Sequence, residues 1–390
     1  MSDPLRLARR MAGIAPFHVM ELLARAQELE AQGRDIVHME VGEPDFPTPG
    51  PVVEAGRVAL AEGRTRYTPA LGIPALREAI SAHYRDYYGV DVPPARIAVT
   101  PGASGALQLA LGVLLEPGQK VLMADPGYPC NRHFVRFCDG EPVSLPVGPD
   151  SDYQILAEHV AAHWDDATRA TMVATPSNPT GTLLDRAQLT ALADATAARG
   201  GALIVDEIYH GLVYGAEEVT AATLADNVIV INSFSKYFGM TGWRLGWMVV
   251  PPALLRPVEK LAQNIYLAPS TPAQYAALAA FRPEVLAELE ARRAEFARRR
   301  DTLLPALREL GFVIPSTPRG AFYLYADSRR FDADSRNLAR RLLEEAGVAA
   351  TPGIDFGENH PEAHLRFAYT TSVARLEEGV ARIARLLERG

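Results

Sequence analysis

The chain has 390 residues, of which 48% are hydrophobic and 22% charged, and a formal net charge of −8. That composition is ordinary for a globular protein, and a core of this size needs no disulfide or metal to hold it together. The acidic balance disfavours a nucleic-acid binder, and no apolar run approaches the ~20 residues of a membrane helix. Two cysteines suit a reducing compartment, so together with the absence of a signal-peptide pattern they predict a cytoplasmic protein. The histidines are scattered, and no metal site is predicted.

The first fifty residues combine one helix, one short strand and a proline-rich segment. An amphipathic pattern predicts a helix over residues 19–32, and a short apolar run predicts a strand over residues 36–41. Residues 42–49 read Gly-Glu-Pro-Asp-Phe-Pro-Thr-Pro and hold too many prolines for a regular element.

From about residue 50 the pattern alternates between helices and short apolar strands. Helices are predicted at residues 52–62, 74–88, 103–115, 185–199 and 271–281. Runs bounded by turn residues predict strands at residues 97–100, 121–124, 171–175, 203–205, 228–232 and 247–250. Strands that alternate with helices require crossovers, and continuous apolar runs suit strands buried on both faces. We therefore predict the α/β class, with a large domain whose mainly parallel sheet is flanked by helices.

The pattern changes near residue 284. A long helix is predicted at residues 284–310, followed by a strand at 322–325, a helix at 335–346, a strand at 365–369 and a last helix at 373–389. Few strands with helices to one side predict a smaller α+β domain, which the N-terminal helix joins. The predicted domains are residues 48–285 for the large domain, and residues 1–47 with 286–390 for the small domain.

The segment that says most about chemistry is residues 233–246, Ser-Phe-Ser-Lys-Tyr-Phe-Gly-Met-Thr-Gly-Trp-Arg-Leu-Gly, which follows an apolar strand. In α/β sheets ligands bind beyond the carboxyl ends of strands, which is where Lys236 lies. A lone lysine at a strand end is usually a solvated charge. Flanking hydroxyls, glycines and Arg244 are instead what an aldehyde cofactor with a phosphate group needs, because an arginine fork binds phosphate and a lysine of lowered pKa is a nucleophile.

This segment resembles the lysine signature of the class I and II aminotransferases, the fold-type-I enzymes that use pyridoxal 5′-phosphate (PLP). The resemblance covers nearly the whole chain, because further motifs occur in the family's order: Gly-Glu-Pro-Asp at 42–45, Asn-Pro-Thr-Gly at 178–181, Asp-Glu-Ile-Tyr at 206–209, Gly-Ala-Phe-Tyr at 320–323 and His-Leu-Arg-Phe-Ala at 364–368. It implies that Lys236 holds PLP as a Schiff base. It also implies an amino-group transfer between an L-amino acid and a 2-oxo acid, with ping-pong kinetics.

The resemblance implies that Lys236, Asp206 and Tyr209 are catalytic. Asp206 would face the pyridine nitrogen and keep it protonated, which makes the ring an electron sink. Taken alone, Asp206 would be read as a helix N-cap. Tyr209 and Asn178 would hydrogen-bond the phenolic oxygen of the cofactor and lower the pKa of the Schiff base. Without the resemblance, Asn178 would be a turn residue and Tyr209 a wall residue.

Donors for the cofactor phosphate are expected at two places. Backbone N–H groups of Ala103 and Ser104 lie at the start of a predicted helix, and such a start binds anions. By resemblance Ser233, Ser235 and Arg244 add further donors.

Two tyrosines complete the cofactor contacts that the resemblance implies. Tyr128 would stack on the cofactor ring. Tyr67 would reach the phosphate of a neighbouring subunit, which predicts a homodimer with a shared active site. Ordinary loop packing is the alternative for Tyr67.

The resemblance also implies a substrate site. Arg366 would bind the α-carboxylate with two parallel hydrogen bonds, assisted by Gly42 and Asn178. A salt bridge on a small-domain strand is the alternative for Arg366. Residues 13–19 would form a lid.

The side-chain specificity is open in the sequence. A dicarboxylate substrate would need a second cation, for which Arg132, Arg136 and Arg319 are candidates by position, although each could be a surface charge. An apolar pocket could instead form from residues 14–17 and 320–323. Relatives with this N-terminal pattern suggest aspartate first, with 2-oxoglutarate as acceptor, while alanine, aromatic and branched-chain donors stay open.

Two other functions compete with transamination. A fold-type-I PLP lyase or decarboxylase would use the same lysine, aspartate and arginine. A non-catalytic amino-acid-sensing regulator is a possibility of another class, and it would need an added DNA-binding segment.

Overall fold

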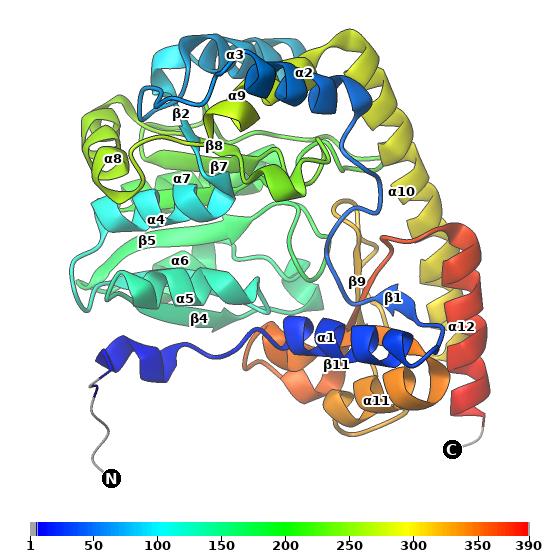
Figure 1. The fold of residues 1–390 in the computed structure, drawn as a ribbon. Helices are drawn as coiled ribbons and strands as arrows, with labels where there is room; N and C mark the ends of the chain where they lie inside the picture. The colour runs from blue at the N-terminus through cyan, green and yellow to red at the C-terminus, as the bar shows by residue number, and fades with distance from the viewer. Residues whose placement is uncertain (1–4, 6, 389–390) are drawn as a thin grey trace.

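Two β-sheets organise the fold, one of seven strands and one of four (Figure 1). The computed structural model describes residue 5 and residues 7–388. The predicted last helical residue, Arg389, and the outermost residues of the predicted small domain lie outside the described residues. Within the described part of the chain, no helix combines the length and apolar character needed to cross a membrane.

The large sheet has the strand order β2-β8-β7-β6-β5-β3-β4. Only β8 runs antiparallel to its neighbours, and all the other pairs are parallel. This confirms the predicted α/β class with a mainly parallel sheet. The strands are β2 (Ile97–Thr100), β3 (Lys120–Asp125), β4 (Glu141–Pro146), β5 (Thr168–Ala174), β6 (Ala202–Asp206), β7 (Val228–Ser233) and β8 (Gly246–Val249).

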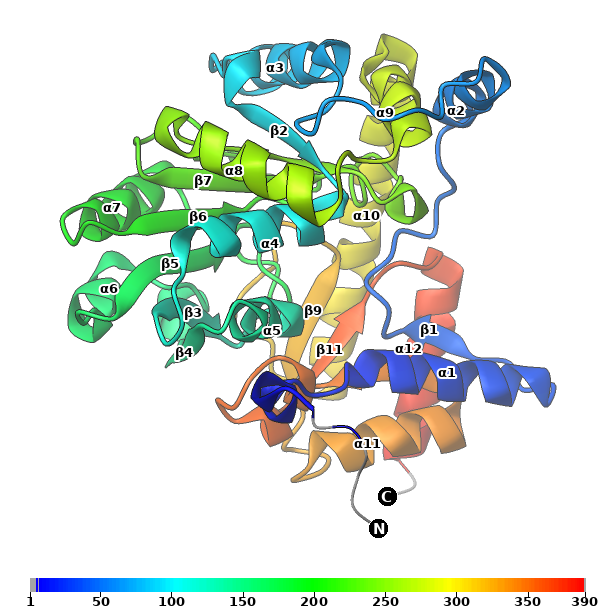
Figure 2. The same ribbon diagram turned by 60° about the vertical axis from the view of Figure 1, so that its left-hand side comes forward.

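Helices cover both faces of the large sheet (Figure 2). The reason is visible in β6, where Leu203 and Val205 pack into one apolar core and Ile204 packs into a second core on the opposite face. A strand that is apolar on both sides must be covered on both sides. The helices of this part are α2 (Gly50–Ala61), α3 (Pro74–Tyr88), α4 (Gly102–Leu114), α5 (Pro129–Phe137), α6 (Ala157–His163), α7 (Arg186–Ala197), α8 (Pro252–Ile265) and α9 (Thr271–Leu278).

The small sheet joins the two ends of the chain. Its order is β1 (Val37–Met39), β10 (Val348–Pro352), β11 (His364–Ala368) and β9 (Tyr323–Asp327), with β1 parallel to β10 and the other pairs antiparallel. Its helices are α1 (His18–Ala31), α10 (Pro283–Leu310), α11 (Ser335–Arg341) and α12 (Val373–Leu387). Helix α10 runs through the predicted boundary at residues 285/286, so the exact division into domains stays a prediction.

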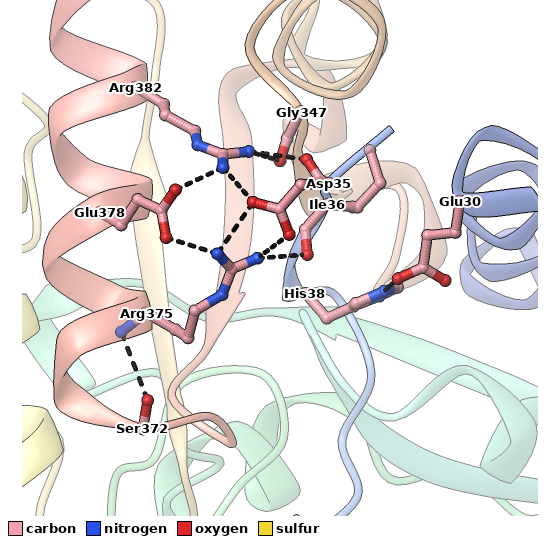
Figure 3. Close-up of polar contacts among 9 residues, drawn as sticks. All are labelled: Glu30, Asp35, Ile36, His38, Gly347, Ser372, Arg375, Glu378 and Arg382. Carbon is pink, nitrogen blue, oxygen red and sulfur yellow. Dashed lines mark hydrogen bonds and ion pairs between the residues drawn. The ribbon is translucent and has the colours of Figure 1, made fainter. Parts of the chain in front are cut away.

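A network of ion pairs ties the start of β1 to α12 (Figure 3). The carboxylate of Asp35 accepts from the Arg375 guanidinium at 2.8 and 2.9 Å and also from Arg382. Both arginines bind Glu378 one turn apart on the same helix. These bonds hold the N-terminal strand in the sheet from the side of the C-terminal helix.

Candidate active site

A cavity of about 270 Å³ lies between the carboxyl ends of the large-sheet strands and strands β9 and β11 of the small sheet. Within the described chain it gathers all the residues that the resemblance implied for cofactor and α-carboxylate binding, except Tyr67. The predicted residues that line it are Gly42, Ala103, Ser104, Tyr128, Asn178, Asp206, Tyr209, Ser233, Ser235, Lys236, Arg244 and Arg366.

Lys236 lies three residues beyond the end of β7, with its side chain partly buried in the cavity. Its Nζ donates a hydrogen bond to the carbonyl oxygen of Gly42 at 2.7 Å. Burial lowers the pKa of this amine to about 8, and the positive charge of Arg366 acts in the same direction while Glu43 opposes it. An uncharged fraction of the amine is therefore available near neutral pH, which a nucleophilic lysine requires.

Asp206 is the last residue of β6 and is buried at the cavity wall. Burial raises the pKa of its carboxyl to about 6, while a hydrogen bond from the Ile208 N–H at 3.1 Å and the charge of Lys236 favour the ionised form. The carboxylate is thus mostly ionised at neutral pH. The alternative of a helix N-cap is wrong, because β6 is followed by a turn and not by a helix, and the Asp206 carboxylate accepts from the Ile208 N–H within that turn.

A pair of buried tyrosines lies next to these residues. The hydroxyl of Tyr209 is 2.8 Å from the hydroxyl of Tyr323, which begins β9. In the sequence, Tyr323 was identified only as part of the Gly-Ala-Phe-Tyr motif and of a possible apolar pocket over residues 320–323. No local sequence pattern predicts the hydrogen bond between Tyr209 and Tyr323, because it joins residues 114 positions apart.

One end of the cavity collects hydrogen-bond donors. Helix α4 starts here with Ala103 and Ser104, and the hydroxyls of Ser233 and Ser235 lie 2.9 Å apart. The Arg244 guanidinium lies so close to the helix start that a Cβ added at Gly102 would meet its Nη2 at 2.8 Å. A helix N-terminus, two hydroxyls and a guanidinium together suit a phosphate dianion.

Arg366 lies on β11 at the opposite side of the cavity and is 2% exposed. Its Nη1 donates to Asn178 Oδ1 at 2.9 Å, and its Nη2 donates to the carbonyl oxygen of Glu40. Its guanidinium stacks over the rings of Tyr323 at 4.3 Å and Phe356 at 4.8 Å. The Nε atom is buried without a hydrogen-bond partner among the described residues. Such a fixed and buried cation is suited to an incoming carboxylate.

Apolar walls close the remaining sides, and the sequence analysis identified few of them. Phe17 and Val19 come from the start of α1, where the Asp355 carboxylate accepts from the backbone N–H groups of His18 and Val19 at 3.0 and 2.8 Å. Further apolar side chains at the cavity are Met20, Val41, Leu107, Phe134 and Ile208.

Four residues singled out in the sequence lie away from this cavity. Tyr67 is 82% exposed and points to solvent in the isolated chain. Arg132 lines a smaller cavity of about 30 Å³ that shares Tyr128, Ala174 and Asn178 with the main one, while Arg136 donates to the Gly13 carbonyl. Neither they nor Arg319 are among the residues that line the main cavity.

Residues 34–383 match the family model for aminotransferase class I and II. The chain belongs to this family. It is 40% identical to a valine–pyruvate aminotransferase of Mycobacterium tuberculosis over 97% of each chain, and 36% identical to the aspartate/prephenate aminotransferase of Thermus thermophilus over 98% of this chain and 99% of the other. A crystal structure of an aminotransferase from Mycobacterium tuberculosis superposes with a TM-score of 0.95 at 40% identity, covering 99% of this chain and 100% of the other.

Class I and II aminotransferases depend on PLP, and the cavity of this aminotransferase fits that cofactor. An amine of lowered pKa on Lys236 suits the aldehyde, the Asp206 carboxylate suits a protonated ring nitrogen, and the donors at the start of α4 suit the phosphate. The protein is therefore a PLP-dependent transaminase.

Proposed function

We propose that this aminotransferase takes its amino group from an L-amino acid with one carboxylate and an apolar side chain, and passes it to a 2-oxo acid. The observation that carries the proposal is the composition of the cavity. Its cations are Lys236, Arg244 and Arg366, and each has another task in the scheme below. Apart from these three, the described residues lining the cavity offer no cation for a second carboxylate.

The proposed roles follow from position. Bound PLP supplies a carbonyl carbon for amines and a ring that withdraws electrons from the substrate Cα. The Lys236 amine would hold the cofactor through its aldehyde carbon, and Nζ would carry the proton that leaves or returns to the substrate Cα. Asp206 keeps the ring nitrogen protonated, and Tyr209 and Asn178 bind the phenolic oxygen.

Further proposed roles concern orientation. Ala103, Ser104, Ser233, Ser235 and Arg244 hold the phosphate, and Tyr128 covers the ring face. Arg366 would fix the α-carboxylate, with help from Gly42 and Asn178, and so would set the orientation of the substrate Cα. The Phe17–Tyr128 edge contact, with ring centroids 6.2 Å apart, supports closure of this side by the start of α1.

The proposed preference for an amino donor with an apolar side chain rests on the apolar residues that line the cavity. Phe17, Val19, Leu107, Phe134 and Ile208 offer no partner for a charged group, and burying an unpaired carboxylate against them is costly. The valine–pyruvate name of one relative agrees with this preference, whereas the aspartate names of other relatives agree with our first expectation from the sequence. The cavity walls favour the apolar donor.

Two further parts of the proposal concern assembly and location. Tyr67 is exposed in a single chain, as expected of a side chain that reaches into a second copy's site, which supports a homodimer with shared active sites. The free cysteines Cys130 and Cys138 support a reducing compartment such as the cytoplasm.

The test is a donor screen on the purified, PLP-loaded protein. Valine, leucine, alanine and phenylalanine are compared with aspartate and glutamate, with pyruvate or 2-oxoglutarate as acceptor. We expect kcat/KM for the best apolar donor to exceed that for aspartate by about tenfold or more. A preference for aspartate that falls in Arg132→Ala, Arg136→Ala or Arg319→Ala would replace the apolar assignment by a dicarboxylate one. Ammonia release without an acceptor would indicate a lyase.

A further inference from the structure

We propose that Tyr323 is a positioning residue of this enzyme: its hydroxyl donates to the Tyr209 oxygen and so directs the Tyr209 proton into the cavity, while its ring supports Arg366. The inference rests on the proposed role of Tyr209 at the cofactor. It assigns separate tasks to the hydroxyl and to the ring of one side chain.

The Tyr209 and Tyr323 hydroxyls together hold one proton more than their mutual hydrogen bond uses. The hydroxyls of Tyr209 and Tyr323 are 2.8 Å apart, and among the described residues this is the hydrogen bond that each phenol makes. Both residues are buried, with 5% and 1% exposed. Two hydroxyls hold two protons, and their mutual bond uses one of them. The other proton has no partner among the residues that the structure describes and is free for a group that enters the cavity.

The charge of Arg366 decides which of the two tyrosines donates the shared hydrogen bond. The Arg366 guanidinium lies 4.3 Å from the centre of the Tyr323 ring. A cation at this distance makes the Tyr323 phenol the better donor, because it stabilises developing negative charge on that ring. Burial raises the pKa of both phenols, and the charge of Arg366 partly offsets the rise for each of them. The hydrogen bond between the two hydroxyls raises the pKa of Tyr209 further and lowers that of Tyr323, so the rise is the larger one for Tyr209. Tyr323 therefore donates, and the Tyr209 proton remains for the cofactor.

The Tyr323 hydroxyl fits closely against the backbone at Gly42. A Cβ added at Gly42 would lie 1.8 Å from this oxygen, so the glycine leaves the room that the hydroxyl occupies. The carbonyl oxygen of Gly42 accepts from Lys236 Nζ on the same strip of backbone. Tyr323 is thus held between Gly42, Tyr209 and Arg366, and its bond to Tyr209 joins β9 of the small sheet to the turn that follows β6 of the large one.

The hydroxyl is tested by an absorbance titration that needs no turnover. In PLP-loaded Tyr323→Phe the midpoint of the pH-dependent absorbance change should move upward by about half a pH unit or more, because Tyr209 loses its orientation. Tyr209→Phe should shift the midpoint at least as far. The double variant should match Tyr209→Phe alone, since the Tyr323 hydroxyl acts through Tyr209. Tyr214→Phe is the matched control, because this buried hydroxyl bonds to the Ala321 carbonyl away from the cavity and should leave the midpoint unchanged.

The ring is tested by carboxylate binding. Isovalerate should bind PLP-loaded Tyr323→Phe about as tightly as wild type, whereas Tyr323→Leu, which lacks the ring beneath Arg366, should bind it several-fold more weakly.

The roles of the Tyr323 hydroxyl, of its ring and of the whole site are overturned by different results. An unchanged midpoint in Tyr323→Phe, or a shift that adds in full to that of Tyr209→Phe, would overturn the role of the Tyr323 hydroxyl while leaving the transaminase intact. Equal isovalerate binding by the Phe and Leu variants would overturn the role of the ring. A wild-type protein that takes up no PLP would overturn the proposed function itself.

Discussion

Replacing Arg366 by lysine should weaken catalysis on amino acids while sparing amines that lack a carboxylate. Arg366 uses Nη1 to bind Asn178 and Nη2 to bind the Glu40 carbonyl, and its buried Nε has no partner among the described residues. A lysine keeps the charge but has a single nitrogen, so it cannot hold these anchors and still offer two parallel donors to a carboxylate.

The expected loss follows from the bonds removed. One hydrogen bond to a charged group is worth about 1.5–3 kcal/mol, and 1.36 kcal/mol is a factor of ten, so kcat/KM for the best amino donor should fall roughly 10- to 150-fold. The assay is steady-state kinetics, alongside single-turnover reaction of the PLP-loaded enzyme with a simple primary amine. Arg300→Lys, another arginine stacked on a tyrosine ring, is the control. An equal loss with the primary amine would show that Arg366 supports the fold rather than the carboxylate, and the reasoning would fail.

Three more predictions concern the lysine, the aspartate and the terminal ion pairs. Burial lowers the pKa of Lys236 to about 8, so the rate of PLP attachment to the cofactor-free protein should rise with pH, with a midpoint near pH 8. A rate that rises only at the pKa of an ordinary lysine, or attachment that persists in Lys236→Ala, would contradict this. Asp206→Asn should keep the fold but slow the first half-reaction by roughly 100-fold or more in a stopped-flow assay, since no charge then holds the ring proton. Hydrogen bonds from Arg375 and then Arg382 lower the pKa of Asp35 to about 2, so the stability from this group is present above pH 4 and is lost as the pH falls towards 2. Asp35→Asn should therefore melt below wild type at pH 7, and the gap should close near pH 2; a gap that is constant with pH would assign the effect to packing.

The sequence predicted the architecture because the periodicities of the large domain are strong. The predicted helix at residues 74–88 and the predicted strand at residues 97–100 match α3 and β2. Elements were missed where local signals conflict with the final packing. Strand β4 contains Pro142, which an edge strand tolerates because it pairs with β3 alone. Helix α8 carries Pro257 in its interior, a residue that ordinarily ends a helix.

The residues of the site also fall into those that the sequence predicted and those that it did not. Residues in short motifs, such as Lys236, Asp206 and Arg366, could be located by resemblance, and the structure places them around one cavity. Of the apolar walls, Phe17 and Tyr323 fall within the segments 14–17 and 320–323 that the sequence offered as a possible pocket, and both line the cavity. Leu107 and the Tyr209–Tyr323 hydrogen bond were not predicted, since they depend on contacts between distant parts of the chain. Tyr67 is exposed in the single chain, and its role at a second copy's site stays a prediction.

The parallel pairing of β1 with β10 has a consequence for how the protein is made. Val37 lies opposite Val348, so the strand needed by the first forty residues emerges from the ribosome more than three hundred residues later. The large sheet draws on residues 97–249 and can assemble in the meantime. The start of helix α1 forms part of the cavity wall, and the apolar side of this helix stays uncovered until β10 has been made. The earliest-made segment is thus among the last to find its place, and a chain that stops before β10 would leave the catalytic cavity open on that side.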